Sequence, residues 1–124
     1  MAAIFVKGSG GGNSGGATIR RGPTIPSSAG SNMQAVTANF TMAKDANFYV
    51  MVGRPNRNTS DTVRVTVYVS GVQVDRFNLA TGGNQYRIEG YPVQKTNIVN
   101  VELYSTGNCG PQMFIAADKD NAFV

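Results

Sequence analysis

The chain has 124 residues, of which 41% are hydrophobic and 9% aromatic, and this length and composition predict one globular domain with a sizeable core. It contains no histidine and a single cysteine, which excludes a Ser-His-Asp arrangement, the common zinc sites and an internal disulfide. The net charge of +4 belongs to the amino-terminal third, because every charged residue before Asp45 is basic. Because histidine, the usual acid–base and metal-ligand residue, is absent, we expect no enzyme activity, no cofactor and no bound metal.

Residues 1–33 are predicted to form an extended, glycine-rich and basic arm. An apolar segment at 3–7 (AIFVK) precedes a glycine-rich run at 8–16, which has the composition of a linker. Pro23 and Pro26 disfavour helix in the basic stretch that follows. We expect the arm to bind partners through its apolar and basic side chains, namely Ile4, Phe5, Val6, Lys7, Arg20, Arg21 and Ile25.

The kind of partner follows from the composition of the arm. Arg20 and Arg21 are adjacent and have no interleaved aromatic residues, which favours an acidic protein surface over nucleic acid. No apolar run approaches the roughly 20 residues that span a bilayer, so no membrane contact is expected. Because the domain is predicted to begin at residue 34, deleting residues 1–31 is expected to leave a folded monomer.

Residues 34–124 are predicted to form an antiparallel β-sandwich. Short segments of alternating apolar and polar residues recur about every ten residues, with turn-forming residues between them, and no segment has the pattern of an amphipathic helix. This spacing is typical of all-β sandwiches and small barrels. A jelly-roll topology is favoured, and an immunoglobulin-like order stays open. The predicted strands are 34–44, 46–52, 63–69, 72–79, 85–89, 97–105 and 112–117.

The segment 62–80 predicts a central hairpin. Valines alternate with polar residues from Val63 to Val69, and the pair Ser70-Gly71 indicates a tight turn. Beyond the turn, Val72 and Val74 share one parity, whereas the apolar residues at 77 and 79 have the other. One extra residue near 75–76, a β-bulge, would return residues 77 and 79 to the core face.

Several polar side chains could carry chemistry, but each has a simpler interpretation. Asp75, Glu89 and Glu102 could be paired carboxylates for glycoside hydrolysis, yet each lies beside an apolar strand residue, as an outward-facing residue does. The segment 118–121 offers oxygen ligands for calcium without the EF-hand pattern, so it is predicted to be a solvated loop in a polar tail. Cys109 is predicted to be buried or idle, since no histidine can activate it.

Three further sets of residues are interpreted in the same way. Arg54 and Arg57 are predicted to lie in a solvated loop, although they could contact an acidic partner. Tyr86 and Ile88 are expected to share the core face of their strand. Five tyrosines could form a platform for stacking sugars, but half-buried tyrosines in a sandwich need no such role; they are Tyr49, Tyr68, Tyr86, Tyr91 and Tyr104.

The opening MAAIFVKGSGGGNSGG, together with the segments VYVSGVQV and NIVNVELY, resembles the small jelly-roll cement or decoration proteins of tailed bacteriophages. This resemblance implies a non-enzymatic protein of the virion, whose sandwich lies over joints between capsid subunits and whose extensions reach across the lattice. It also implies the major capsid protein or other virion proteins as partners, and we expect a homo-oligomer. The alternative class is a carbohydrate-binding module of a tail or adhesin, because VYVSGVQV is also typical of such jelly rolls.

Overall fold

The computed structural model describes residues 18–22, 24–25, 29–54, 62–79 and 85–123. Within these ranges the regular structure consists of strands and one short 3-10 helix, η2 (Gly107–Cys109). No described helix is long and apolar enough to cross a membrane. The strands are β1 (Thr18–Arg21), β2 (Met33–Thr41), β3 (Ala46–Arg54), β4 (Arg64–Val69), β5 (Val72–Asn78), β6 (Gln85–Val93), β7 (Ile98–Thr106) and β8 (Gln112–Ala117).

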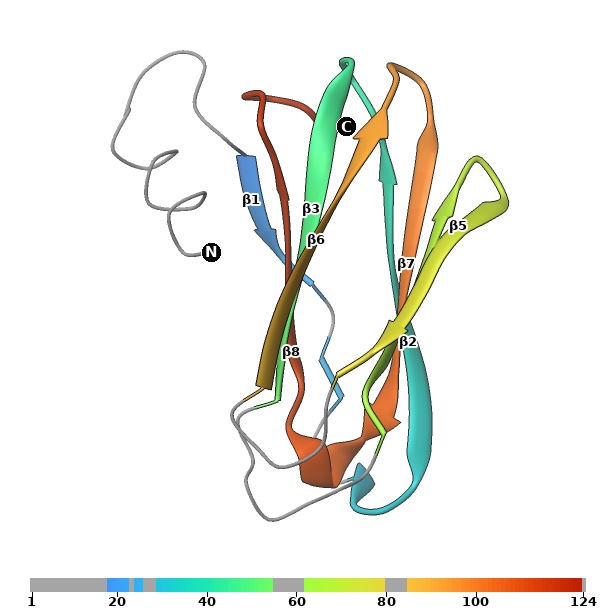
Figure 1. The fold of residues 1–124 in the computed structure, drawn as a ribbon, viewed down its shortest axis with the longest axis vertical. Coiled ribbons are helices and arrows are strands. Elements are labelled where there is room, and N and C mark those ends of the chain that lie inside the picture. Colours follow the sequence, from blue (N-terminus) through green and yellow to red (C-terminus); the bar gives the residue numbers. More distant parts are fainter. Residues whose placement is uncertain (1–17, 23, 26–28, 55–61, 80–84, 124) are drawn as a thin grey trace.

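The strands form two four-stranded antiparallel sheets that pack face to face (Figure 1). Sheet A has the order β1-β8-β3-β6, and sheet B has the order β2-β7-β4-β5. The first strand therefore pairs with the eighth, the second with the seventh, the third with the sixth and the fourth with the fifth. This nested pairing defines a jelly roll. The predicted all-β sandwich is confirmed, and the jelly-roll order replaces the immunoglobulin-like alternative.

The core lies between the inner faces of the two sheets. Phe48, Val50 and Val52 of β3 are fully buried, as the alternation in the sequence predicted. Val65 and Val67 of β4, and Val63 directly before it, are also fully buried, and they face these β3 residues from sheet B. Burial of each such side chain contributes roughly 1.5–3 kcal/mol, so these two central strands supply much of the packing energy.

The central hairpin has the predicted turn and bulge. Ser70 and Gly71 have φ values of 48° and 84°, the positive pair that a two-residue type I′ turn requires. The register shifts by one residue between Val67 and Tyr68, which leaves Val74 as the extra residue beside Asp75. Phe77 is thereby returned to the core, where it is 5% exposed.

The phase of β6 differs from the prediction. Arg87, Glu89 and Tyr91 pair with Val52, Val50 and Phe48, so the odd-numbered residues of β6 point toward the core. Tyr86 and Ile88 consequently lie on the outer face, and Tyr86 is 56% exposed. The prediction was wrong because it followed the apolar residues of β6, whereas this edge strand turns polar side chains inward.

The predicted boundary at residue 34 also differs from the structure. Strand β1 pairs with β8 in sheet A, and Gly22 donates its backbone N–H to Met113 O at 2.7 Å. Ile25 is 3% exposed and belongs to the core cluster. Residues 18–22 and Ile25 of the predicted arm are therefore part of the sandwich, and Ile25 is unavailable to a partner. Four residues of β1 with two arginines gave too weak a strand pattern to be recognised.

The predicted polar tail contributes to the core as well. Ala122 and Phe123 are buried, and the Phe123 ring lies 4.8 Å from that of Phe40. Phe123 also forms an isolated antiparallel bridge with Met42. These two apolar residues close one end of the sandwich. The polar turn before them concealed this role in the sequence.

Candidate interaction surfaces

The outward residues of β3, β6 and β8 form an apolar surface, which we call the outer face of sheet A. Its apolar and aromatic members are Tyr49, Met51, Tyr86, Ile88 and Phe114. Met51 pairs with Ile88 on one side and with Phe114 on the other, so these three form a row across the sheet. No outward position of these three strands carries a charged side chain. A sandwich needs only its inner faces to be apolar, so this composition calls for a separate explanation.

Two glycines allow aromatic rings to lie against this sheet. A Cβ on Gly90 would lie 2.7 Å from a ring carbon of Tyr49, and a Cβ on Gly53 would lie 2.8 Å from ring carbons of Tyr86. Both distances are too short for real atoms, so the two rings occupy the space above the glycines. The tyrosines therefore lie on the sheet and widen the apolar surface beyond the central row.

The outer face of sheet B is polar by comparison. The Arg64 guanidinium lies 4.5 Å from the centre of the Tyr104 ring, and Arg76 Nε donates to Thr66 Oγ1 at 3.3 Å. Asn100 of β7 donates a side-chain hydrogen bond to Asn39 of the adjacent strand β2. Charged and amide groups thus occupy the middle of this face and bond to one another, while the exposed Met33 and Ile98 lie at opposite ends of the β2–β7 pair.

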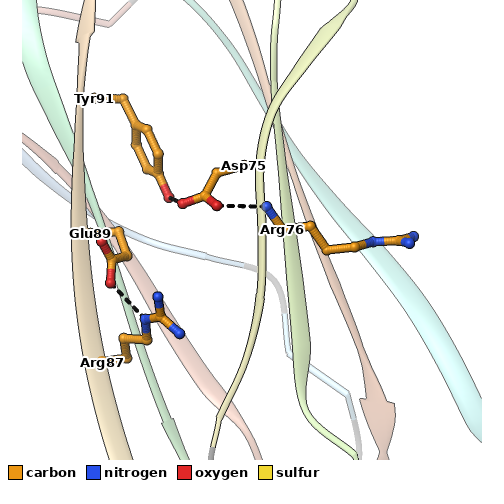
Figure 2. Close-up of polar contacts among 5 residues, drawn as sticks. All are labelled: Asp75, Arg76, Arg87, Glu89 and Tyr91. Carbon is orange, nitrogen blue, oxygen red and sulfur yellow. Dashed lines mark hydrogen bonds and ion pairs between the residues drawn. The ribbon is translucent and has the colours of Figure 1, made fainter.

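A polar cluster joins the two sheets along the edge where β5 and β6 meet (Figure 2). Tyr91 of β6 donates its hydroxyl to Asp75 Oδ2 of β5 at 2.6 Å. Asp75 Oδ1 also accepts the backbone N–H of Arg76 at 2.8 Å, while the Arg76 side chain points away from the cluster. Arg87 pairs with Glu89 at 2.6 Å and lies 4.3 Å from the centre of the Phe77 ring of the opposite sheet.

The chemistry of this cluster is that of a structural contact. Burial, followed by the hydrogen bond to Asp75, raises the pKa of Tyr91 far above its ordinary value, so its hydroxyl stays protonated and donates. Glu89 is held by Arg87. Asp75 and Glu89 were predicted to face outward, and that prediction was wrong for both. Glu102 does lie on the outer face of sheet B, since it pairs with Thr37 and Thr66.

A second buried contact involves Arg54 and Cys109. Arg54 is fully buried and donates to Cys109 Sγ at 3.1 Å, so the predicted solvated position for Arg54 was wrong. Cys109 is buried as predicted. Burial acts to raise the pKa of its thiol, but the neighbouring side chains of Ser105, Thr106 and Arg54 outweigh burial and lower that pKa. A fully buried sulfur has no access to a substrate, which makes this contact structural.

The carboxylates near the carboxyl terminus hold loops together. Asp118 accepts both the backbone N–H and the side-chain amide of Asn47 at 2.9 Å, and Asp120 pairs with Lys44 at 3.2 Å. Among the described residues there is no group of three or more His, Cys, Asp or Glu side chains that could hold a metal ion.

The predicted partner-binding residues do not form one site in the described structure. Arg20 and Arg21 belong to β1, where their backbones pair with Ile115 and Phe114 of β8. Ile25 lies in the core. Ile4, Phe5, Val6 and Lys7, and also Arg57 of the predicted loop, lie outside the described residues.

The five tyrosines, for which a sugar-stacking platform was the less favoured interpretation, are divided among three surfaces. Tyr49 and Tyr86 lie on the outer face of sheet A, Tyr68 and Tyr104 on that of sheet B, and Tyr91 points inward. The apolar outer face itself was missed, although a signal was present. Segment 46–52 (ANFYVMV) is apolar at both parities, and such a run indicates a strand that is covered on both sides.

Comparison with known proteins places the fold. No protein-family model and no curated protein sequence matches this chain. Among solved structures, the CBM51 module of GH95 from Clostridium perfringens, solved in complex with methyl-galactose, has a TM-score of 0.54 at 13% identity, covering 85% of this chain and 94% of that one. A chain of Broad Bean Stain Virus has a TM-score of 0.53 at 11% identity, covering 87% and 85%.

A chain of the naturally occurring empty particles of cowpea mosaic virus gives a similar result. Its TM-score is 0.52 at 8% identity, with 85% of each chain covered. At these identities the likeness is one of fold. The chain therefore shares its jelly-roll sandwich both with virus-particle proteins and with a sugar-bound module.

Proposed function

We propose that this chain is a non-enzymatic virion structural protein that binds and stabilises a capsid lattice, as a cement or decoration protein does. The observation that carries the proposal is the apolar outer face of sheet A. Tyrosine, methionine and phenylalanine are the side chains enriched at the centres of protein interfaces, where charged residues are depleted. The outward positions of β3, β6 and β8 have this composition, and the outer face of sheet B, which carries Arg64, Arg76 and Glu102, does not.

The proposal assigns different roles to the two ends of the predicted arm. Residues 18–22 and Ile25 complete the sandwich. The segment 3–7, with Ile4, Phe5, Val6 and Lys7, is proposed to contact neighbouring subunits, and the partner is the major capsid protein or another virion protein. A capsid lattice suits such a protein because it repeats the same joint many times, so many copies of one small chain can occupy equivalent sites.

The test is co-sedimentation of the full chain with purified particles of the virus whose genome encodes it. The natural chain is expected to bind at a fixed number of copies per capsid subunit. Ile88→Thr, which places a polar group at the β6 end of the apolar row, is expected to reduce occupancy about tenfold or more. Val72→Thr is the matched control, since Val72 is 65% exposed but lies on β5 of sheet B. Equal binding by the two variants, or no binding by the natural chain, would contradict the proposal.

A second candidate is a carbohydrate-binding module, and one observation favours it. Tyr49 and Tyr86 lie against the sheet over Gly90 and Gly53, and exposed aromatic rings in this position can stack on sugar rings. Titration of the full chain with methyl-galactose, followed by a glycan array, tests this function. Binding that Tyr86→Ala abolishes and Ile88→Thr leaves unchanged would favour the module over the capsid protein.

A further inference from the structure

Strand β2 is a sheet edge without the features that usually prevent strand pairing. It lies at one end of sheet B and pairs with β7 over nine residues in unbroken register. Within the described part of the chain it pairs with no second strand. Its sequence, MQAVTANFT, contains no charged residue and no proline. A long, regular edge of this kind presents a row of backbone groups that can accept another strand.

The other three edge strands each carry such a feature. Strand β5 has the bulge at Val74 and the charged pair Asp75 and Arg76. Strand β6 contains Pro92, which lacks a backbone donor, and strand β1 has only four residues. Strands β5 and β6 are the edges of the two sheets on the same side of the sandwich, where Tyr91 bonds to Asp75. Both edges on that side are therefore protected. The difference is therefore specific to β2.

We propose that β2 pairs antiparallel with β2 of a second copy of this chain, about a two-fold axis at Thr37. Thr37 is the middle residue of the nine, so this register pairs the whole strand. On the outer face Thr37 meets its own symmetry mate, and Ala35 meets Asn39. On the inner face the half-buried Val36 meets Ala38, which extends the core across the joint.

A second copy is the occupant that these residues fit best. The strand is uncharged, so its own copy brings no like charges into opposition although the chain carries a net charge of +4. Threonine facing threonine is a favourable cross-strand pair. A two-fold contact through one edge is closed, so it yields a dimer and not a fibre. The inference adds an oligomeric state to the proposed function and does not depend on capsid binding.

Sedimentation velocity of the full chain, over a concentration series and without particles, tests the pairing. The natural chain is expected to show a monomer–dimer equilibrium. Thr37→Lys places two lysines opposite each other and is expected to raise the dimer dissociation constant on the order of 10-fold or more. Thr37→Glu is expected to do the same, and an equimolar mixture of the two variants is expected to recover the dimer. Asn78→Lys adds the same charge at the exposed end of β5, and it is expected to leave the dimer intact.

Four results would overturn the pairing. They are a chain that is monomeric at every concentration, a dimer unaffected by Thr37→Lys, an equal loss with Asn78→Lys, and a mixture that stays monomeric. The alternative occupant of the β2 edge is the segment 1–17 of the same chain. Hydrogen exchange distinguishes this occupant from a second copy. Protection of the β2 amides that falls on dilution supports the dimer. Protection that is independent of concentration and is lost on deleting residues 1–17 contradicts it.

Discussion

The two outer faces of the sandwich are built from the same kind of strand but differ in what they present. On sheet B, Arg64 and Arg76 lie over Tyr104 and Thr66, so polar groups meet water and one another. On sheet A, the row Phe114, Met51 and Ile88 presents hydrocarbon. The fold requires neither arrangement, because stability comes from the inner faces. The proposed partner for sheet A rests on this difference.

The largest expected effect concerns how much of the amino-terminal region belongs to sheet A. Deleting residues 1–17 is expected to leave the melting temperature nearly unchanged. Deleting residues 1–31 also removes β1 and the buried Ile25. Loss of a buried isoleucine side chain alone costs about 2–5 kcal/mol, so this deletion is expected to unfold the domain or lower its melting temperature sharply. Thermal unfolding followed by circular dichroism distinguishes the two. A folded 32–124 fragment of full stability would return the boundary to residue 34.

A smaller effect is expected where the two sheets are joined. Asp75→Ala removes the acceptor of the Tyr91 hydroxyl and is expected to lower the free energy of unfolding by about 1–2 kcal/mol. Glu102→Ala is the matched control, because that carboxylate lies on the outer face of sheet B and its loss should cost less than about 0.5 kcal/mol. Urea denaturation measures both. Equal costs would mean that the Asp75–Tyr91 contact does not hold the sheets together.

The same contact predicts a dependence on pH. The raised pKa of Tyr91 means that the folded state keeps its proton at pH values where the unfolded state loses it. The resulting stabilisation is fully present below the ordinary tyrosine pKa of about 10 and is lost as the pH rises above it. Tyr91→Phe is therefore expected to show a shallower fall in melting temperature between about pH 9 and pH 11. Parallel curves for the two proteins would show that Tyr91 does not contribute.

A finer change tests how the rings are held on sheet A. Gly90→Ala places a Cβ where the Tyr49 ring lies, so the ring must move. The expected cost is about 1 kcal/mol, the low end of the range for overpacked sites. Near-ultraviolet circular dichroism should change with it, since the environment of Tyr49 changes. A variant with native stability and an unaltered spectrum would mean that the ring has space elsewhere.

The sequence predicted most of the fold because the signals were local. Alternation located the strands from β2 to β5, and β7 and β8, while Ser70-Gly71 and the parity change beyond it located the turn and the bulge. The features that the sequence did not predict depend on contacts between residues that are distant in the sequence. Strand β1 exists because β8 pairs with it, and the buried Arg54 donates a hydrogen bond to Cys109, which is 55 residues away in the sequence.

The inversion of β6 has a similar origin. In the sequence, Tyr86 and Ile88 are the obvious core residues, but pairing with β3 turns Arg87 and Tyr91 inward, where Phe77 and Asp75 receive them. The outer face of sheet A was missed for the same reason. An apolar residue was assigned to the core by default, so a face of apolar residues that points outward was not recognised. The proposed contribution of residues 4–7 remains a prediction.

Hydroxyl-radical footprinting of the full chain, free and mixed with virus particles of the proposed source, tests the contrast between the two faces most directly. Both faces carry tyrosines, so one experiment reports on each. The account predicts that binding protects Tyr49, Met51 and Tyr86 on sheet A from oxidation, whereas Tyr68 and Tyr104 on sheet B react as in the free protein. Protection of Tyr68 and Tyr104 with unchanged reactivity at Met51 and Tyr86 would contradict it.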